Sequence, residues 1–259
     1  MKKLPLFAII VISLLSLAGS CSKEVSGHAA MQVDSFNLVI YFKPVADSSK
    51  LSFDSTYTNY WKEKYSVSAF KYYISHINLI NTDSNVTRQI NTEKYFLVNA
   101  ADSASCLVKL SAAPYRYNRI SFLIGVDSLH NVSGAQEGAL DPVNGMFWTW
   151  NSGYVMAKLE GRSNVSSLVN NKIEYHIGGF KGESSVLRQP TLLFPFGKYL
   201  EVKAGTNATM TITANVNAWF YNPRQLKISE NPSCTTPGPL AQDISENYSR
   251  MFTVTAITN

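Results

Sequence analysis

Hydrophobic and polar residues alternate along four segments of this chain, with the period of two that is typical of half-buried β-strands. In the cleanest segment, Met210, Ile212, Ala214 and Val216 alternate with threonine and asparagine. The same alternation occurs in residues 36–43, 119–126 and 172–177. No window shows a sustained helical period, so helical turns are expected only in short segments, at Thr56–Lys64, Ala218–Tyr221 and Ala241–Arg250. The pattern predicts an all-β protein.

Turn-forming residues separate the predicted strands at short intervals. Asn81–Asn85 lies between two apolar runs, and Lys203–Asn207 precedes the cleanest strand. Short strands at this spacing indicate a two-sheet antiparallel β-sandwich, and neither an internal repeat nor a linker divides it. We therefore expect a single domain with one core over residues 33–259.

The longest segment without strand character runs from Asp127 to Asn144. A loop of this length in a compact domain is usually functional or disordered, and we expect a functional one here. Asp127, Glu137 and Asp141 offer the oxygen ligands that calcium takes, but they lack the regular spacing of a calcium-binding loop. A solvated, locally hydrogen-bonded loop is therefore favoured over a calcium site.

The N-terminal segment has the features of a secretory signal. Lys2 and Lys3 precede a short apolar run, and the small residues Ala18–Ser20 lead directly to Cys21. This resembles a bacterial lipobox, in which the cysteine is lipidated, although Ala18 stands where leucine is commoner. We expect a signal peptide at residues 1–20, a lipid on Cys21, and a polar tether at residues 21–32. The protein would then be anchored to the outer membrane, on its periplasmic or its outer face. An ordinary signal peptide cut nearby is the alternative.

Composition and charge exclude two further classes. At 45% hydrophobic and 12% aromatic residues, the chain is too apolar to be disordered, and its aromatic residues favour strands. Removal of residues 1–20 takes away two lysines and no acid, so the formal charge falls from +5 to +3. The remaining basic residues are scattered, so nucleic acid is not an expected partner.

Two cysteines remain once Cys21 is assigned to the lipid. Cys106 and Cys234 lie 128 positions apart in a chain expected to be exported, where disulfides persist. A bridge between them would close a long loop and stabilise the fold by about 4 kcal/mol. Two unpaired thiols are the equal alternative, because the sequence does not place the two side chains.

An aromatic block directly follows the long loop. Trp148 and Trp150 are two positions apart, which places them on one face of an extended segment, near Met146 and Tyr154. From the residues alone, the block is either a structural plug at the end of the sandwich or an oxidisable cluster at the functional loop. The plug is the commoner of the two.

Several blocks of the chain resemble the MbnP-like family. The most specific is the run Gly145–Tyr154, with its Trp-x-Trp motif and the Lys158-Leu159-Glu160-Gly161 that follows. Weaker matches occur in the family's order at Tyr72–Ser75, Tyr175–Phe180 and Asn215–Phe220, and together they span most of residues 33–220. The resemblance implies an exported, β-rich, copper-binding protein. It also implies that a partner di-haem enzyme related to cytochrome c peroxidases oxidises one tryptophan to kynurenine, which ligates copper together with histidines.

The resemblance implies positions in this chain for some of the copper ligands. Trp148 or Trp150 is the kynurenine candidate, and we favour Trp148, the first of the pair. His176 is the leading histidine ligand, because it lies in the matching His-Ile-Gly-Gly block on the polar face of its strand. His76 is the second, at a position where relatives are expected to have asparagine, and His130 in the long loop is the third.

The residue chemistry agrees with a copper site. Imidazole suits copper, and the thioether of Met146 would favour Cu(I), although core packing is the commoner role of such a methionine. The motifs of nucleophilic hydrolases, metalloproteases and nucleotide-binding enzymes are missing from the sequence, so no enzyme is expected.

A surface binding module is the alternative function. An exported β-sandwich with exposed tryptophan and tyrosine can bind glycans or another envelope protein without any metal, because aromatic rings stack on sugars and dominate protein interfaces. Copper content and the mass of the tryptophan block, measured on protein from the native host, would distinguish the two functions.

Overall fold

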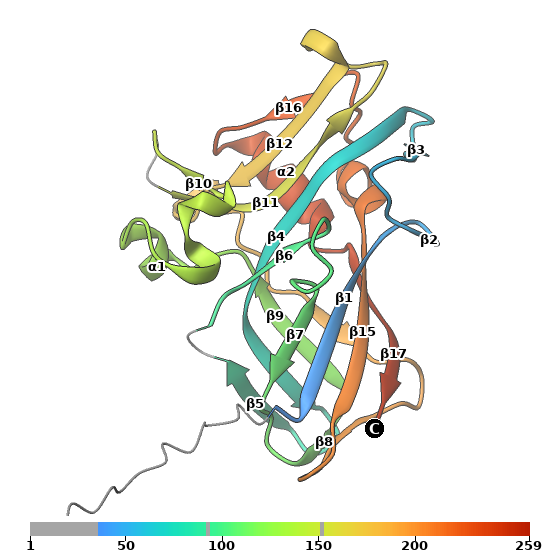
Figure 1. Ribbon diagram of the computed structural model, residues 1–259, viewed down its shortest axis with the longest axis vertical. Helices are drawn as coiled ribbons and strands as arrows, with labels where there is room; N and C mark the ends of the chain where they lie inside the picture. Colours follow the sequence, from blue (N-terminus) through green and yellow to red (C-terminus); the bar gives the residue numbers. More distant parts are fainter. Residues whose placement is uncertain (1–35, 92–93, 151–152) are drawn as a thin grey trace, which may run out of the picture. The chain divides into compact units, whose positions relative to one another are not determined.

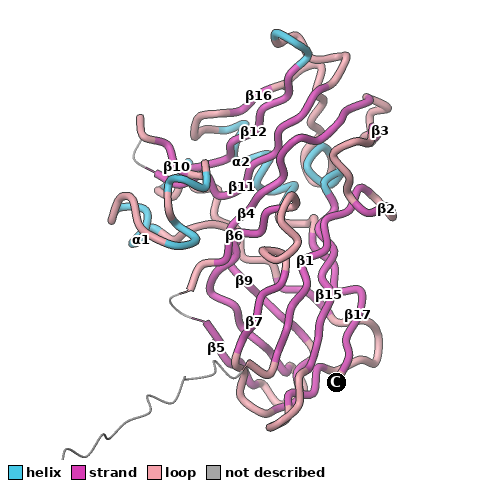
Figure 2. Tube along the Cα trace, viewed as in Figure 1, coloured by secondary structure: helices cyan, strands magenta, loops and turns pink. Residues whose placement is uncertain are grey.

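The computed structural model describes residues 36–91, 94–150 and 153–259 (Figure 1). β-Strands dominate this part of the chain, with short helices between them (Figure 2), so the predicted all-β class is confirmed. The predicted signal peptide, Cys21 and the tether lie outside the described residues. In the described part, no helix is both long enough and apolar enough to cross a membrane.

One sheet contains five strands, in the order β17–β15–β1–β2, with β7 also paired to β1. Their bounds are β1 Leu38–Ala46, β2 Ser49–Lys50, β7 Leu107–Leu110, β15 Ala208–Asn215 and β17 Phe252–Thr258. The cleanest alternation of the sequence forms β15, which pairs with β1 in parallel. The other pairings of this sheet are antiparallel. Alternation within one strand does not reveal the direction of its neighbour, so the parallel pair was not expected.

The second sheet is built around β4 (Lys64–Asn81), the longest strand. Its order is β13–β9–β4–β11–β12–β16. In addition, β3, β5 and β6 pair with β4, and β10 pairs with β11. The first half of β4 pairs with β11, and the second half pairs with β9 and β5. The remaining bounds are β3 Thr56–Thr58, β5 Val86–Asn91, β6 Phe96–Asn99, β9 Arg119–Ile124, β10 Phe147–Trp148, β11 Gly153–Arg162, β12 Lys172–Gly178, β13 Thr191–Leu193 and β16 Ser233–Cys234. A separate pair joins β8 (Tyr115–Tyr117) to β14 (Leu200–Val202).

Aromatic rings from both sheets meet in the core. Phe42 and Phe252 come from the five-stranded sheet, whereas Tyr72 and Phe122 come from the other sheet. Their rings make edge-to-face contacts with centroids 5.0 to 6.3 Å apart. This is a preferred geometry of aromatic pairs. The predicted sandwich, with one core between two sheets, is therefore present.

Short helices occur at two of the three predicted places. The helix α2 (Pro239–Tyr248) and the 3-10 turn η5 (Val216–Phe220) agree with the expectation. The helical turn predicted for Thr56–Lys64 is wrong, because β3 and β4 form a hairpin there. The Asn59 side chain makes the turn, since its Oδ1 accepts hydrogen bonds from the backbone N–H groups of Trp61 and Glu63.

The predicted loop Asp127–Asn144 contains short helical segments. These are α1 (Ser128–Val132), η1 (Gly138–Leu140) and η2 (Pro142–Asn144). Two further 3-10 turns lie elsewhere, at η3 (Val169–Asn171) and η4 (Gly182–Ser184). Asp127 caps α1, and Asp141 caps η2 through its side chain. Asp127 and Asp141 thus act as local hydrogen-bond acceptors, whereas the Glu137 side chain does not cap η1.

The disulfide alternative is wrong, because Cys106 and Cys234 are both unpaired and buried. The Cys106 thiol lies 3.7 Å from the carbonyl oxygen of Asn99, just before β7 of the five-stranded sheet. Cys234 lies on β16, at the far edge of the second sheet. Different sheets hold the two thiols, and burial raises the pKa of each.

Candidate functional site

The outer face of β11 and β12 collects most of the chemistry that the sequence indicated. The two strands pair in register, so that Lys158 lies directly opposite His176, and Glu160 lies directly opposite Glu174. Because successive side chains of a strand alternate between faces, these four residues share one face. Their neighbours Leu159, Tyr175 and Ile177 point into the core.

His176 lies at the centre of this group. Its Nε2 is 2.6 Å from Oε1 of Glu160 and 3.7 Å from Oε1 of Glu174. These three residues offer one ligand atom each, and the three atoms lie within 4.8 Å of one another. The hydrogen bond from His176 lowers the pKa of Glu160 to about 2, and the charge of Lys158 lowers it further. Burial raises this pKa, but the two favourable interactions together outweigh it. Glu160 is therefore a carboxylate throughout the neutral pH range.

Lysines complete the charge balance of the His176 group. Lys158 Nζ lies 3.6 Å from Glu160, and Lys172 Nζ lies 2.8 Å from Glu174. Lys158 also donates a hydrogen bond to the backbone oxygen of Gly145, at 2.6 Å, while Lys71 on β4 donates one to that of Asn144, at 3.0 Å. The end of the long loop is thus fastened to the same face that carries His176.

The tryptophan block joins this face through Gly178. The Trp148 ring covers Gly178 so closely that a Cβ there would lie 2.4 Å from Cζ3 of the indole. Gly178 is two positions after His176 on β12, so Trp148 and His176 occupy the same face. Trp148 is 7% exposed, whereas Trp150 is 63% exposed, with ring centroids 5.3 Å apart. The structure therefore distinguishes the two tryptophans, which spacing alone did not.

Met146 is fully buried in the core. A thioether in that position packs against apolar side chains and is not presented to a metal on the outer face. Its placement agrees with the packing role that the sequence also allowed.

The other two predicted histidines lie elsewhere, around Asp127. Oδ2 of Asp127 is 3.0 Å from Nδ1 of His130 and 3.8 Å from Nε2 of His76. His76 is five residues beyond Lys71 on β4, a distance of about 16 Å along a strand. Lys71 is the β4 residue that aligns with Lys158 and His176, so His76 belongs to a different group.

Sequence reasoning missed several members of both groups. Glu174 and Tyr95 were not singled out, and Glu160 was noted only as part of the Lys158–Gly161 block. The signal for the first group was present, because Lys158-x-Glu160 and Glu174-x-His176 each put two polar residues on one strand face. The sequence of either strand alone does not predict the register that brings those faces together.

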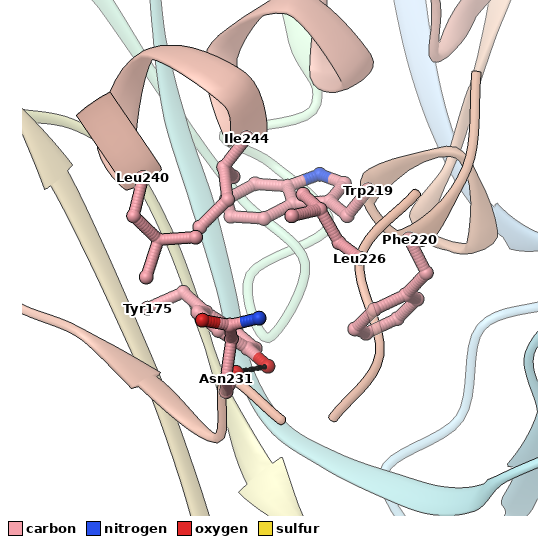
Figure 3. A pocket seen from close by; sticks show the side chains of 7 residues that line it. All are labelled: Tyr175, Trp219, Phe220, Leu226, Asn231, Leu240 and Ile244. Carbon is pink, nitrogen blue, oxygen red and sulfur yellow. Dashed lines mark hydrogen bonds between the residues drawn. The ribbon is translucent and has the colours of Figure 1, made fainter. Parts of the chain in front are cut away.

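An internal hollow beneath α2 is too small to be a ligand site. It is lined by side chains of β12, η5, α2 and the segment before β16, and Tyr175 donates a hydrogen bond to the backbone oxygen of Asn231 there (Figure 3). Its volume of about 10 Å³ is enough for about one water molecule.

A sequence model of the MbnP family matches residues 35–236, most of the chain. The chain belongs to the MbnP family. Its fold is similar to that of MbnP from Methylosinus trichosporium, with 12% sequence identity, a TM-score of 0.46, and coverage of 78% of this chain and 82% of that one. A search of curated proteins found no match.

Membership of the MbnP family associates this chain with copper and methanobactin at the level of the family. The residues of the His176 group fit a copper ion by their donor chemistry. An imidazole nitrogen suits copper, and two carboxylates supply oxygen donors and negative charge beside it. The ammonium groups of Lys158 and Lys172 pair with these carboxylates, so a cation would compete with them.

Proposed function

We propose that this MbnP-family chain is an exported, lipid-anchored protein that binds copper on the outer face of β11 and β12. The observation that supports this most is the His176 group, in which an imidazole and two carboxylates converge on a rigid sheet beside Trp148. Side chains on paired strands hold their positions better than side chains on loops. The role is binding of the metal, and no catalytic step is assigned.

In this proposal, His176 and Glu160 are the first ligands. Nε2 of His176 hydrogen-bonds to the Glu160 carboxylate at 2.6 Å, so copper would have to take the place of the proton between these two atoms. When bound, copper would supply a tightly held, redox-active cation. Oε1 of Glu174 lies 3.7 Å from the same nitrogen and would add a second carboxylate that balances the charge.

Trp148 is the kynurenine candidate of this proposal. Oxidation would cleave the C2–C3 bond of the indole and add two oxygen atoms, with two equivalents of hydrogen peroxide reduced to water. Hydrolysis would then release the formyl group as formate and leave an aromatic amine and a ketone. Because the Trp148 ring covers Gly178, two positions after His176 on β12, both new donors would arise on the face that carries the histidine. Hydrogen peroxide is the oxidant, and a partner di-haem peroxidase is the proposed catalyst.

The proposed location rests on the lipobox-like sequence at Ala18–Cys21. A lipid on Cys21 would hold the domain at the outer membrane through the tether. Mass spectrometry of the N-terminal peptide from the native host would check the lipid. An unmodified Cys21 in the mature protein would remove the anchor from the proposal.

Metal analysis of protein purified from its native host tests the copper site. The wild-type protein should carry copper and a kynurenine at position 148. Replacement of His176 by Ala should weaken copper binding by about tenfold or more, while Trp148→Phe should abolish the kynurenine. Trp150→Phe is the matched control and should keep both. Native protein without copper, or full copper affinity in the His176→Ala variant, would overturn the proposal.

A second candidate function, glycan binding, has one observation in its favour. The rings of Tyr60 and Tyr221 are partly exposed and stacked, with centroids 3.8 Å apart, at the edge of a cleft of about 670 Å³. Asp47, Asn215 and Asn217 line the same cleft. Exposed aromatic faces beside amides and a carboxylate are chemically suited to sugars. The polar groups bond chiefly to one another, however, since Asn217 donates to Asp47 at 2.8 Å.

Affinity electrophoresis in gels containing neutral polysaccharides such as dextran, laminarin and xylan tests this second function. Retardation of the wild-type protein that disappears in the Tyr60→Ala variant would support a glycan site. The fully exposed Phe196 supplies a control, because Phe196→Ala removes an aromatic ring away from the cleft. Equal mobility of wild-type protein with and without each polysaccharide would count against it.

A further inference from the structure

The group around Asp127 joins side chains from three parts of the chain. His76 comes from the middle of β4, Tyr95 precedes β6, and Asp127 and His130 belong to the start of α1. We propose that His76, Asp127 and His130 form a second metal site, separate from the copper site, for a divalent transition-metal ion such as zinc. Two imidazoles and one carboxylate are a common ligand set of such ions.

The backbone at His76 is the first argument. His76 has a φ of +50°, which non-glycine residues seldom adopt, although it lies inside an 18-residue strand. The pairings of β4 with β9 and with β5 both shift register next to it. Bulges of this kind re-aim a side chain, and strained residues gather at functional sites. Here the bulge turns the His76 imidazole toward Asp127.

Hydrogen bonds around His76 set its tautomer. Ser75 Oγ donates to the backbone oxygen of Gly125 at 3.0 Å, so it accepts a hydrogen bond from Nδ1 of the His76 ring at 3.1 Å. The neutral ring therefore carries its proton on Nδ1 and its lone pair on Nε2. An outer hydrogen bond that fixes the tautomer in this way is typical of metal-ligating histidines.

The spacing between His76 and Asp127 fits a shared ion better than a hydrogen bond. Nε2 of His76 lies 3.8 Å from Oδ2 of Asp127, too far for a hydrogen bond. In a tetrahedral site with bonds of about 2.0 to 2.2 Å, neighbouring ligand atoms lie about 3.4 Å apart. A metal ion can therefore bind between these two atoms. The ligand atoms of His76, Asp127 and His130 do not all lie within 4.8 Å of one another, so the His130 imidazole must move toward the ion when it binds.

Asp127 is held in place by its second oxygen. Its Oδ1 accepts hydrogen bonds from the backbone N–H groups of Leu129 and His130, at 2.9 and 3.2 Å, and so caps α1. Its Oδ2 faces the two histidines and the hydroxyl of Tyr95, which donates to it. Burial opposes the charge, but these hydrogen bonds outweigh it and keep the pKa of Asp127 below its usual value.

His130 completes the set and opens it to solvent. Its Nδ1 lies 3.0 Å from Oδ2 of Asp127 and 2.7 Å from the hydroxyl of Tyr95, so binding a metal through Nδ1 moves the ring proton to Nε2. Tyr95 and His130 line a cavity of about 180 Å³ together with Gln136. A hydrated ion can approach through this cavity, and a water can occupy the fourth position. Tyr95 then acts as a positioning residue for the carboxylate and imidazole.

Zinc binding to the full chain tests the second site, with Zn²⁺ alone as the probe. The His176→Ala protein serves as the background, because it removes the imidazole of the copper site. After chelation and dialysis, this protein should bind one zinc ion in a competition titration, and X-ray absorption at the zinc edge should show two imidazoles. Adding His76→Ala, or separately Asp127→Asn, should weaken zinc binding by about tenfold or more.

Asp127→Asn keeps the oxygen that caps α1, so it tests the charge without removing the cap. Circular dichroism checks that each variant is folded. The absence of zinc binding in the His176→Ala background would refute the second site, as would equal zinc affinity with and without His76→Ala. Unchanged copper affinity in His176→Ala alone would overturn only the proposed copper site. The two proposals can thus fail separately.

Discussion

His176 reaches Glu160 across two regular, paired strands, whereas His76 reaches Asp127 from a bulge in β4. In the first group, all side chains follow the ordinary alternation of a sheet, and the ion pairs are already short. In the second group, one residue has a left-handed backbone, another caps a short helix, and the closest His76–Asp127 distance leaves a gap. The first arrangement is a satisfied ion-pair network that a metal must compete with. In the second group, no residue in the described part of the chain hydrogen-bonds to Nε2 of His76, whose backbone is strained.

Among the substitutions that test the first group, Gly178→Ala should reduce the folding stability most. The new Cβ would lie 2.4 Å from Trp148 Cζ3 and 2.9 Å from the backbone oxygen of Tyr154, and the backbone atom cannot move aside easily. Overpacking of this kind costs about 1 to 3 kcal/mol or more, and we expect about 2 to 4 kcal/mol because of the backbone contact. Urea unfolding measures the loss, and indole fluorescence reports displacement of Trp148. Unchanged stability would show that the Trp148 ring does not rest on β12.

Glu160→Gln should have the next largest effect. The substitution removes the partner of His176 and leaves Lys158 without its carboxylate, at a cost of about 1 to 3 kcal/mol at neutral pH. The folded protein lowers the pKa of Glu160 from 4.5 to about 2. The stabilisation is therefore complete above pH 4.5 and is lost as the pH falls toward 2.

Urea unfolding of the wild-type protein and of Glu160→Gln between pH 2 and pH 7 measures this dependence. The difference between the two should shrink as the pH falls from about 4.5 to about 2. Glu201→Gln is the control, because Glu201 forms exposed ion pairs on β14. A constant difference across this range would show that the His176–Glu160 pair does not stabilise the fold.

The same contrast explains how far the sequence predicted this molecule. Alternation located β1, β9, β12 and β15 and placed His176 on a polar face, because a half-buried strand imposes that period. It did not predict the pairing of Glu160 with Glu174, because register depends on the partner strand. It did not predict the bulge at His76 either, since a histidine in a long apolar strand pattern carries no sign of a left-handed backbone.

The stabilities of His76→Gly and His76→Ala should differ by about 1 kcal/mol. Both remove the imidazole, but only glycine adopts a φ of +50° without strain. We therefore expect the glycine variant to be more stable than the alanine variant by about 1 kcal/mol. At His176, which lies in regular strand geometry, the same pair should show the opposite order, because glycine weakens a strand interior. Urea unfolding of the four variants decides this. If the glycine and alanine variants had the same order of stability at both positions, the backbone at His76 would not be strained.

Trp150→Phe should change stability least, by about 0.5 kcal/mol or less, because 63% of the Trp150 side chain is exposed. Trp148→Phe should cost more, since Trp148 is almost buried and covers Gly178. If Trp150 serves only as an exposed neighbour of Trp148, its replacement should also leave the copper content of native-host protein unchanged. A loss of copper in Trp150→Phe without a loss of stability would move the functional tryptophan to the exposed position.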